Sequence, residues 1–200
     1  MSKARKINQQ VPFGINTPLF EGQLIRLGPI DHEKDPAVES RWTHDSIFMR
    51  LLEIGPVYPL SPAQIKKRYE ALEKEAEEKK NLFHFHIRAR QDDRLVGLAL
   101  VEWIEWTNGN GFLKLGIGSP EERGKGWGSE ALRLLLRYTF GELNLFRVSA
   151  FVQEYNRGAI HLFKKFGFVE EVHRRQALYR DGRRWDLILF GLLHTEWVNQ

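Results

Sequence analysis

The segment Gly116-Ile-Gly-Ser-Pro-Glu-Glu-Arg123-Gly-Lys-Gly-Trp-Gly-Ser-Glu-Ala131 joins an apolar run to a long amphipathic pattern. Its glycines at positions 124, 126 and 128 permit backbone conformations and close approaches that a side chain would prevent. The helix expected after them begins with unpaired N–H groups and a dipole that favour an anion. The segment therefore predicts a backbone cradle for a pyrophosphate-bearing ligand; the structural alternative is a glycine-rich connector.

Two common phosphate motifs do not fit this segment. A Walker loop has four residues between its first glycine and the Gly-Lys pair, followed by Ser or Thr. Here Gly118 lies one position too far from Gly124, and Gly126 follows the lysine. A dinucleotide fingerprint opens the first βαβ unit as Gly-x-Gly-x-x-Gly, whereas this loop reads Gly-x-Gly-x-Gly and lies past the middle of the chain.

A second block carries a more specific signal: Asn156-x-x-Ala159-x-x-x-Phe163-x-Lys165-x-Gly167-Phe168. Together with Arg123-x-x-Gly126-x-Gly128, it resembles the two signatures of the GNAT superfamily of acetyl-CoA-dependent N-acetyltransferases. The resemblance extends from about residue 24 to residue 197. The turn at 181–186 before a final apolar strand is similar to the branch that contains ribosomal-protein N-terminal and spermidine acetyltransferases.

The resemblance implies acetyl-CoA as co-substrate, with its pyrophosphate on the backbone of residues 124–128 and charge added by Arg123 and Lys125. Backbone groups of residues 115–117 would contact the pantetheine arm, and that strand is expected to splay from its neighbour. Asn156 is either a contact near the pantetheine or only a helix N-cap. The cofactor-binding candidates are Leu115, Gly116, Ile117, Arg123, Gly124, Lys125, Gly126, Trp127, Gly128, Ser129, Asn156 and Lys165.

The chemistry of an amine acceptor requires a base, because a lysine-like amine with a pKa near 10.4 is mostly protonated at neutral pH. Glu102 and Glu105 are the candidates, beside Trp103 and Trp106, whose rings could hold a cation. Three residues apart on a regular strand, the two carboxylates point to opposite faces, so at most one faces the cleft unless a bulge intervenes. The structural alternative for either is a solvated edge.

A proton donor for the departing thiolate is harder to identify. Where many relatives of the family have a tyrosine, this chain has Phe163, which has no proton to give. Tyr155 and Tyr179 are candidate replacements, and each is equally compatible with an ordinary packed or surface tyrosine. We expect solvent or one of these tyrosines to suffice.

The order of patterns predicts an α/β (α+β) domain with a central mixed, mostly antiparallel sheet of six to seven strands and about four helices. Strands are expected at 24–28, 83–89, 95–106, 112–118, 147–152, 169–178 and 185–192. Helical patterns cover 35–52, 61–80, 129–144 and 156–166. Residues 13–200 are predicted to form one domain, and residues 1–12 a disordered basic tail.

Composition sets further limits. Hydrophobic residues make up 42% of the 200 residues, which fits a globular domain, and the absence of cysteine excludes disulfides and thiolate chemistry. We expect a cytoplasmic protein without a membrane segment, because no apolar run reaches the length of a span. His84 and His86 are interpreted as a polar strand surface, and no metal site is predicted.

We expect an N-acetyltransferase that moves acetyl from acetyl-CoA to a primary amine by direct attack. The acceptor classes left open are protein N-terminal amines, small polyamines and aminoglycoside-type drugs. The alternative is a coenzyme A-binding sensor with little turnover. Nucleic acid is disfavoured as a partner, since basic residues outside the tail are interspersed with acids. A homodimer is compatible with the resemblance.

Overall fold

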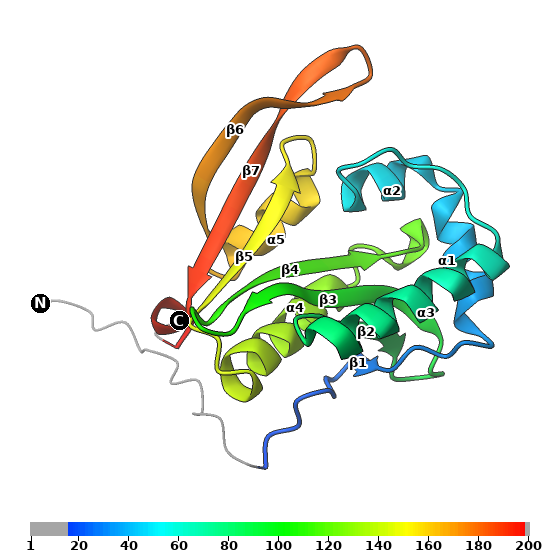
Figure 1. The fold of residues 1–200 in the computed structure, drawn as a ribbon, viewed down its shortest axis with the longest axis horizontal. Coiled ribbons are helices and arrows are strands. Elements are labelled where there is room, and N and C mark those ends of the chain that lie inside the picture. The colour runs from blue at the N-terminus through cyan, green and yellow to red at the C-terminus, as the bar shows by residue number, and fades with distance from the viewer. Residues whose placement is uncertain (1–15, 199–200) are drawn as a thin grey trace, which may run out of the picture.

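The computed structural model describes residues 16–198, and the basic tail predicted for residues 1–12 lies outside that range. Seven strands form one mixed, mostly antiparallel sheet in the order β1-β2-β3-β4-β5-β7-β6 (Figure 1). This confirms the predicted fold class. The strands are β1 (Ile25–Gly28), β2 (Phe83–Ala89), β3 (Leu95–Glu105), β4 (Asn110–Ile117), β5 (Arg147–Gln153), β6 (Val169–Arg180) and β7 (Arg183–Leu193).

The helices differ from the predicted patterns at three places, one of which is a short helix at His194–Trp197 that no pattern predicted. The region expected to be helical over 35–52 is divided, because the Asp45 side chain accepts hydrogen bonds from the N–H groups of Ile47 and Phe48 and starts a new helix. The helix expected to run to residue 144 changes at Tyr138 into a π-helical turn. The helices are α1 (Asp35–Thr43), α2 (Ser46–Leu52), α3 (Pro62–Lys79), α4 (Trp127–Arg137), α5 (Arg157–Lys165) and α6 (His194–Trp197).

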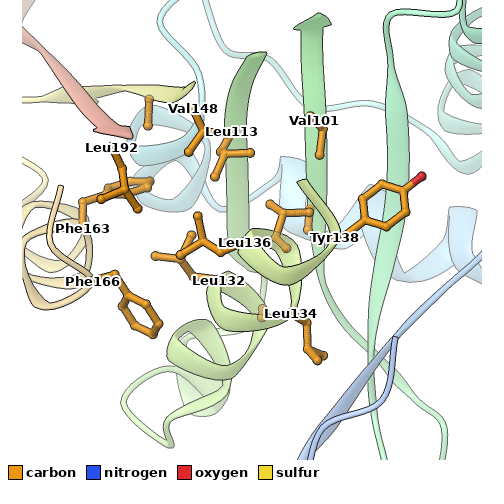
Figure 2. Packing of buried hydrophobic residues seen from close by; sticks show 14 of the residues in the cluster. Val101, Leu113, Leu132, Leu134, Leu136, Tyr138, Val148, Phe163, Phe166 and Leu192 are labelled. Carbon is orange, nitrogen blue, oxygen red and sulfur yellow. The ribbon is translucent and has the colours of Figure 1, made fainter. Parts of the chain in front are cut away.

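One face of the sheet carries the main hydrophobic core. Leu132 and Leu136 of α4 lie against Leu113 of β4 and Val148 of β5, and Phe163 adds the contribution of α5 (Figure 2). Leu132 and Leu136 are fully buried, at 0% exposure. Burying such side chains contributes roughly 1.5–3 kcal/mol each, so this face fixes α4 and α5 on either side of the β4–β5 junction.

The part of the opposite face around His84 and His86 is polar and yet buried, so the prediction that these two residues form a polar surface is wrong. Helices α1 and α3 cover it: His86 is 0% exposed, and its Nδ1 lies 2.6 Å from Oδ2 of Asp35 in α1. Arg88 donates to the same carboxylate oxygen. Strand alternation shows which residues share a face, but it cannot show that helices will cover the polar one.

Two pKa values change with this burial. Burial lowers the pKa of His84 to about 3, so its imidazole is neutral. For Asp35, burial alone would raise the pKa, but the hydrogen bond from His86 and the charge of Arg88 hold it below its usual range. The carboxylate therefore stays ionised as the centre of this network.

The sheet opens in its middle. Strand β4 pairs in parallel with β5 only between residues 110–112 and 147–149, while β4 continues beside β3 as far as Ile117. The last part of β4 and the last part of β5 thus diverge, which confirms the predicted splay. None of the helices within residues 16–198 has the length and hydrophobicity that crossing a bilayer requires.

Candidate active site

Two cavities meet at the splay between β4 and β5. The loop-side cavity, of about 490 Å³, extends toward the glycine loop before α4. The bulge-side cavity, of about 270 Å³, extends toward the distal half of β3. Both are lined by Leu51 and Leu52 of α2, Leu115 of β4, and Asn156 and Ala159 at the start of α5. The splay is therefore a passage with two ends.

The loop-side cavity brings together most of the predicted cofactor-binding residues. Its lining includes Leu115, Gly116, Ile117, Arg123, Gly124, Gly126, Gly128, Ser129, Asn156 and Lys165. Lys125 and Trp127 lie outside it. The ammonium of Lys125 contacts the carboxylate of Glu122 at 2.9 Å and lies 5.5 Å from the centroid of the Trp127 ring.

The loop exposes backbone to this cavity. Gly124 and Gly126 have φ values of +77° and +86°, in the region that favours glycine. Within residues 16–198, no side chain caps the first turn of α4, and a Cβ placed on Gly128 would meet nothing closer than 3.9 Å. The free N–H groups at a helix start, beside open space, fit a phosphate-bearing ligand.

The side chain of Arg123 forms hydrogen bonds within the protein. Its Nε donates to the carbonyl of Ile117 at 3.1 Å, and its Nη2 donates to the carbonyl of Gly118 at 2.7 Å. Nη2 also contacts the Asp45 carboxylate at 3.3 Å. The guanidinium thus fastens the loop to the end of β4 and to the start of α2.

Helix α2 forms a roof over the passage, and the loop after β5 holds it there. The Asn156 amide donates to the carbonyl of Leu51 at 3.1 Å, while its carbonyl oxygen accepts from the N–H of Ala159 as the N-cap of α5. The hydroxyl of Tyr155 donates to the carbonyl of Arg50 at 2.9 Å. The roof is therefore anchored to the far side of the splay.

A bulge in β3 shapes the second cavity. Glu102 pairs with Phe112, and Glu105 pairs with Asn110, so β3 has one residue more than β4 between these pairs. Trp103 takes up the difference with φ +53°. Its ring packs edge-on against Phe112, which in turn stacks on Phe151 of β5. Two carboxylates, Glu53 and Glu102, and an aromatic wall therefore line the bulge-side cavity.

Burial raises the pKa of the Glu102 carboxyl, and the charge of Lys114 only partly offsets it. The Lys114 ammonium is already paired, because both carboxylate oxygens of Glu53 accept from it at 2.7 Å. Among the described residues, Glu102 forms no ion pair. It is the carboxylate of this cavity that is free to accept a proton.

The other predicted catalytic residues line neither cavity. Glu105 accepts from the side-chain amides of Asn108 and Asn110 in the β3–β4 turn. The proton of Tyr155 is donated to a backbone carbonyl, and Tyr179 lies on the β6–β7 hairpin with 59% exposure. Phe163 lines the bulge-side cavity and stacks on Phe190.

The roof and much of the wall of the bulge-side cavity carry no sequence signal. Leu51, Leu52 and Glu53 follow no motif, and Phe112, Phe151 and Gln153 read as ordinary strand residues. The Asp45-Ser46 pair is a helix-start signal that could have divided the 35–52 region. Nothing in the sequence indicates that the second helix would cross the splay.

The chain is similar to known acetyltransferases. Residues 25–169 match the family model described as an acetyltransferase (GNAT) domain. The uncharacterized N-acetyltransferase p20 of Bacillus licheniformis is 32% identical over 119 residues, which are 57% of this chain and 64% of that protein. The probable N-acetyltransferase YjcK of Bacillus subtilis (strain 168) is 35% identical over 94 residues, covering 46% of this chain and 49% of that protein. The chain thus spans less than two thirds of either relative.

A solved structure shares the fold. The spermidine N-acetyltransferase from Vibrio cholerae, in complex with CoA and spermine, superposes with a TM-score of 0.76 at 23% identity. The match covers 88% of this chain and 98% of that one. At this identity the similarity supports a shared architecture and does not identify the ligands of this chain.

Proposed function

The chain belongs to the GNAT family of acetyltransferases, and we propose that it transfers an acetyl group from acetyl-CoA to a primary amine by direct attack of the amine on the thioester. The acceptor classes are a protein N-terminus and a small polyamine. The observation that carries the proposal is the passage through the splay, which has a backbone cradle at one end and a partly buried carboxylate at the other.

The residues around the loop-side cavity fit acetyl-CoA, which supplies an acetyl group activated as a thioester. The N–H groups of residues 124–128 would hold its pyrophosphate, with the positive end of α4 behind them. Lys165 and His161 of α5 line the same cavity and would add positive charge or hydrogen bonds. The unpaired end of β4, at residues 115–117, would bind the pantetheine arm through its backbone.

Glu102 is the proposed general base. Its pKa is raised by burial and therefore lies closer to the pKa of the protonated amine than the pKa of an exposed glutamate does. A smaller difference between the two pKa values favours proton transfer. The rings of Trp103 and Phe112 would hold the protonated acceptor before it loses its proton. Tyr155 and Tyr179 remain candidates for protonating the thiolate, and solvent is the third.

Two measurements test the proposal. Calorimetry with acetyl-CoA should detect binding, and thiol release across a panel of primary amines should detect turnover. If acetyl-CoA binds and no amine in the panel releases thiol, the transferase proposal fails.

Binding of acetyl-CoA without turnover would instead favour a coenzyme A sensor. The specific observation behind it is Phe163, which is 4% exposed and occupies the position where a donor hydroxyl would be expected. A sensor would change its stability or partner binding with acetyl-CoA without consuming it.

A further inference from the structure

The distal part of the β6–β7 hairpin is strongly basic. Between residues 174 and 185 it has five arginines and one acid, Asp181, which pairs with Arg50 of α2. Among the described residues, none of the five arginines forms an ion pair with an acid, and Arg180 donates to backbone carbonyls instead. The other four are Arg174, Arg175, Arg183 and Arg184. Unpaired guanidinium groups on an exposed hairpin are ready-made partners for carboxylates.

The strand register divides these arginines between two faces of the hairpin. Arg183 opposes Arg180, and two residues further on Trp185 opposes Leu178, so these side chains share a face. Arg184 opposes Tyr179 on the other face. Arg183 lies over the Trp185 ring at 3.3 Å. The register also opposes Arg174 to Leu187, two residues after Trp185, which places Arg174 on the face of Arg183.

This face looks over the mouth of the bulge-side cavity. The Trp185 ring packs against Tyr155, which lies in the β5–α5 turn beside the cavity. Arg180 donates to the carbonyls of Ile54 and Gly55 at 2.7 Å and 2.9 Å, and both of those residues line the cavity. In Figure 1 the hairpin rises beyond the rest of the sheet on the side of α2. An acceptor held in the cavity would leave it along this face.

We propose that the acceptor is a peptide or protein N-terminus followed by acidic residues, and that Arg174 and Arg183 bind those acidic side chains. This inference rests on the proposed function and chooses between its acceptor classes. The cavity itself suits a cation, through Glu102 and the aromatic wall, whereas the surface beyond it suits anions. An acidic peptide with a free amino terminus has a cationic end, which would fit the cavity, followed by anionic side chains, which would fit that surface. A polyamine is cationic along its whole length and would bring its distal ammonium groups toward unpaired arginines.

The test compares acetylation of matched octapeptides that begin with serine and alanine and continue with a run of aspartate, serine or lysine. The readout is kcat/KM by thiol release, with the full chain, at low and high salt. We expect the aspartate peptide to exceed the serine peptide about tenfold at low salt, since two partly exposed ion pairs contribute on that order. The lysine peptide should be the poorest, and high salt should reduce the differences.

Substitutions on the two faces separate a specific site from a general effect of charge. The double variant R174Q/R183Q should lose the preference for aspartate while acetylating the serine peptide as the parent does. R184Q is the control for position, because it removes one charge from the other face of the same hairpin, and it should keep the preference. The inference is overturned if the double variant still prefers aspartate, or if spermidine is a better acceptor than the aspartate peptide.

A binding measurement keeps the inference separate from catalysis. Fluorescence anisotropy with N-acetylated, dye-labelled aspartate and serine peptides reports affinity without turnover. If no amine is acetylated, the proposed function fails, and tighter binding of the aspartate peptide by the parent but not by R174Q/R183Q would still support the acidic-peptide surface. Equal affinities for the two peptides would refute it.

Discussion

The two cavities at the splay are built in different ways. Half of the residues that line the loop-side cavity come from one continuous stretch, residues 115–129, and four of them are glycines. The bulge-side cavity is made of side chains from α2, β3, β4, β5 and α5, which meet only in the folded chain. A ligand that every member of a family shares can be bound by backbone, whereas a ligand that differs among members needs side chains that can change.

The strongest challenge to this contrast is Gly126→Val. A β-branched residue is strained at φ +86°, so the loop should leave its conformation and its N–H groups should no longer converge. We expect acetyl-CoA affinity to fall on the order of 1000-fold, about 4 kcal/mol, measured by calorimetry. Unchanged affinity would refute the backbone cradle.

Gly182→Val is the matched control for that substitution. Gly182 has φ +75° in the β6–β7 turn, and a Cβ there would meet no atom within 4 Å. The variant should lose stability for the same conformational reason while it retains acetyl-CoA affinity. Thermal unfolding and calorimetry on both variants separate strain from binding.

Glu102→Gln tests the side-chain half of the contrast. Removing the base should lower kcat/KM about 100-fold and leave acetyl-CoA affinity unchanged. Because burial raises the pKa of Glu102, the acid limb of the parent's pH–rate profile should lie above the usual carboxyl range, and the variant should lose that limb. Glu105→Gln addresses the other carboxylate: if it removes the limb and Glu102→Gln does not, Glu105 is the base.

Glu102→Gln should lower kcat/KM without lowering the stability of the fold. A carboxyl whose pKa is raised by folding contributes stability below its unfolded pKa and loses that contribution as the pH rises through the folded value. At neutral pH the ionised Glu102 therefore costs stability, and Glu102→Gln should melt no lower than the parent. A lower melting temperature would mean that the charged form is stabilised in the fold.

A smaller effect is expected for Arg123→Gln. Arg123 lines the loop-side cavity, and its hydrogen bonds to the carbonyls of Ile117 and Gly118 hold the loop in place. Losing them should weaken acetyl-CoA binding about tenfold, with the acceptor's KM unchanged. A loss as large as that of Gly126→Val would indicate that the guanidinium binds phosphate directly.

The smallest effect is expected for Tyr155→Phe, which removes the hydroxyl that donates to the Arg50 carbonyl. Loosening the roof should raise the acceptor's KM about threefold, corresponding to roughly 0.6 kcal/mol. The basic limb of the pH–rate profile should not move, and Tyr179→Phe should match the parent. A shifted basic limb in either variant would identify that tyrosine as a proton donor.

The sequence predicts the fold, and most of its cofactor-binding candidates line the loop-side cavity, because both depend on local signals. Alternation, the Ser61 capping box and the glycines between β4 and α4 act over a few residues and are visible in the chain. The bulge-side cavity depends on the crossing of α2 and on the bulge at Trp103, which arise from tertiary packing. The burial of His86 under α1 has the same origin.

The five residues that line both cavities have a consequence for the donor. Leu51, Leu52, Leu115, Asn156 and Ala159 form a constriction where, under the proposed function, the two substrates would meet. An acyl group longer than acetyl would extend through the constriction into the space where the amine approaches. Preference for a short acyl chain would then follow from the shape of the passage, without a separate acyl pocket that excludes longer chains.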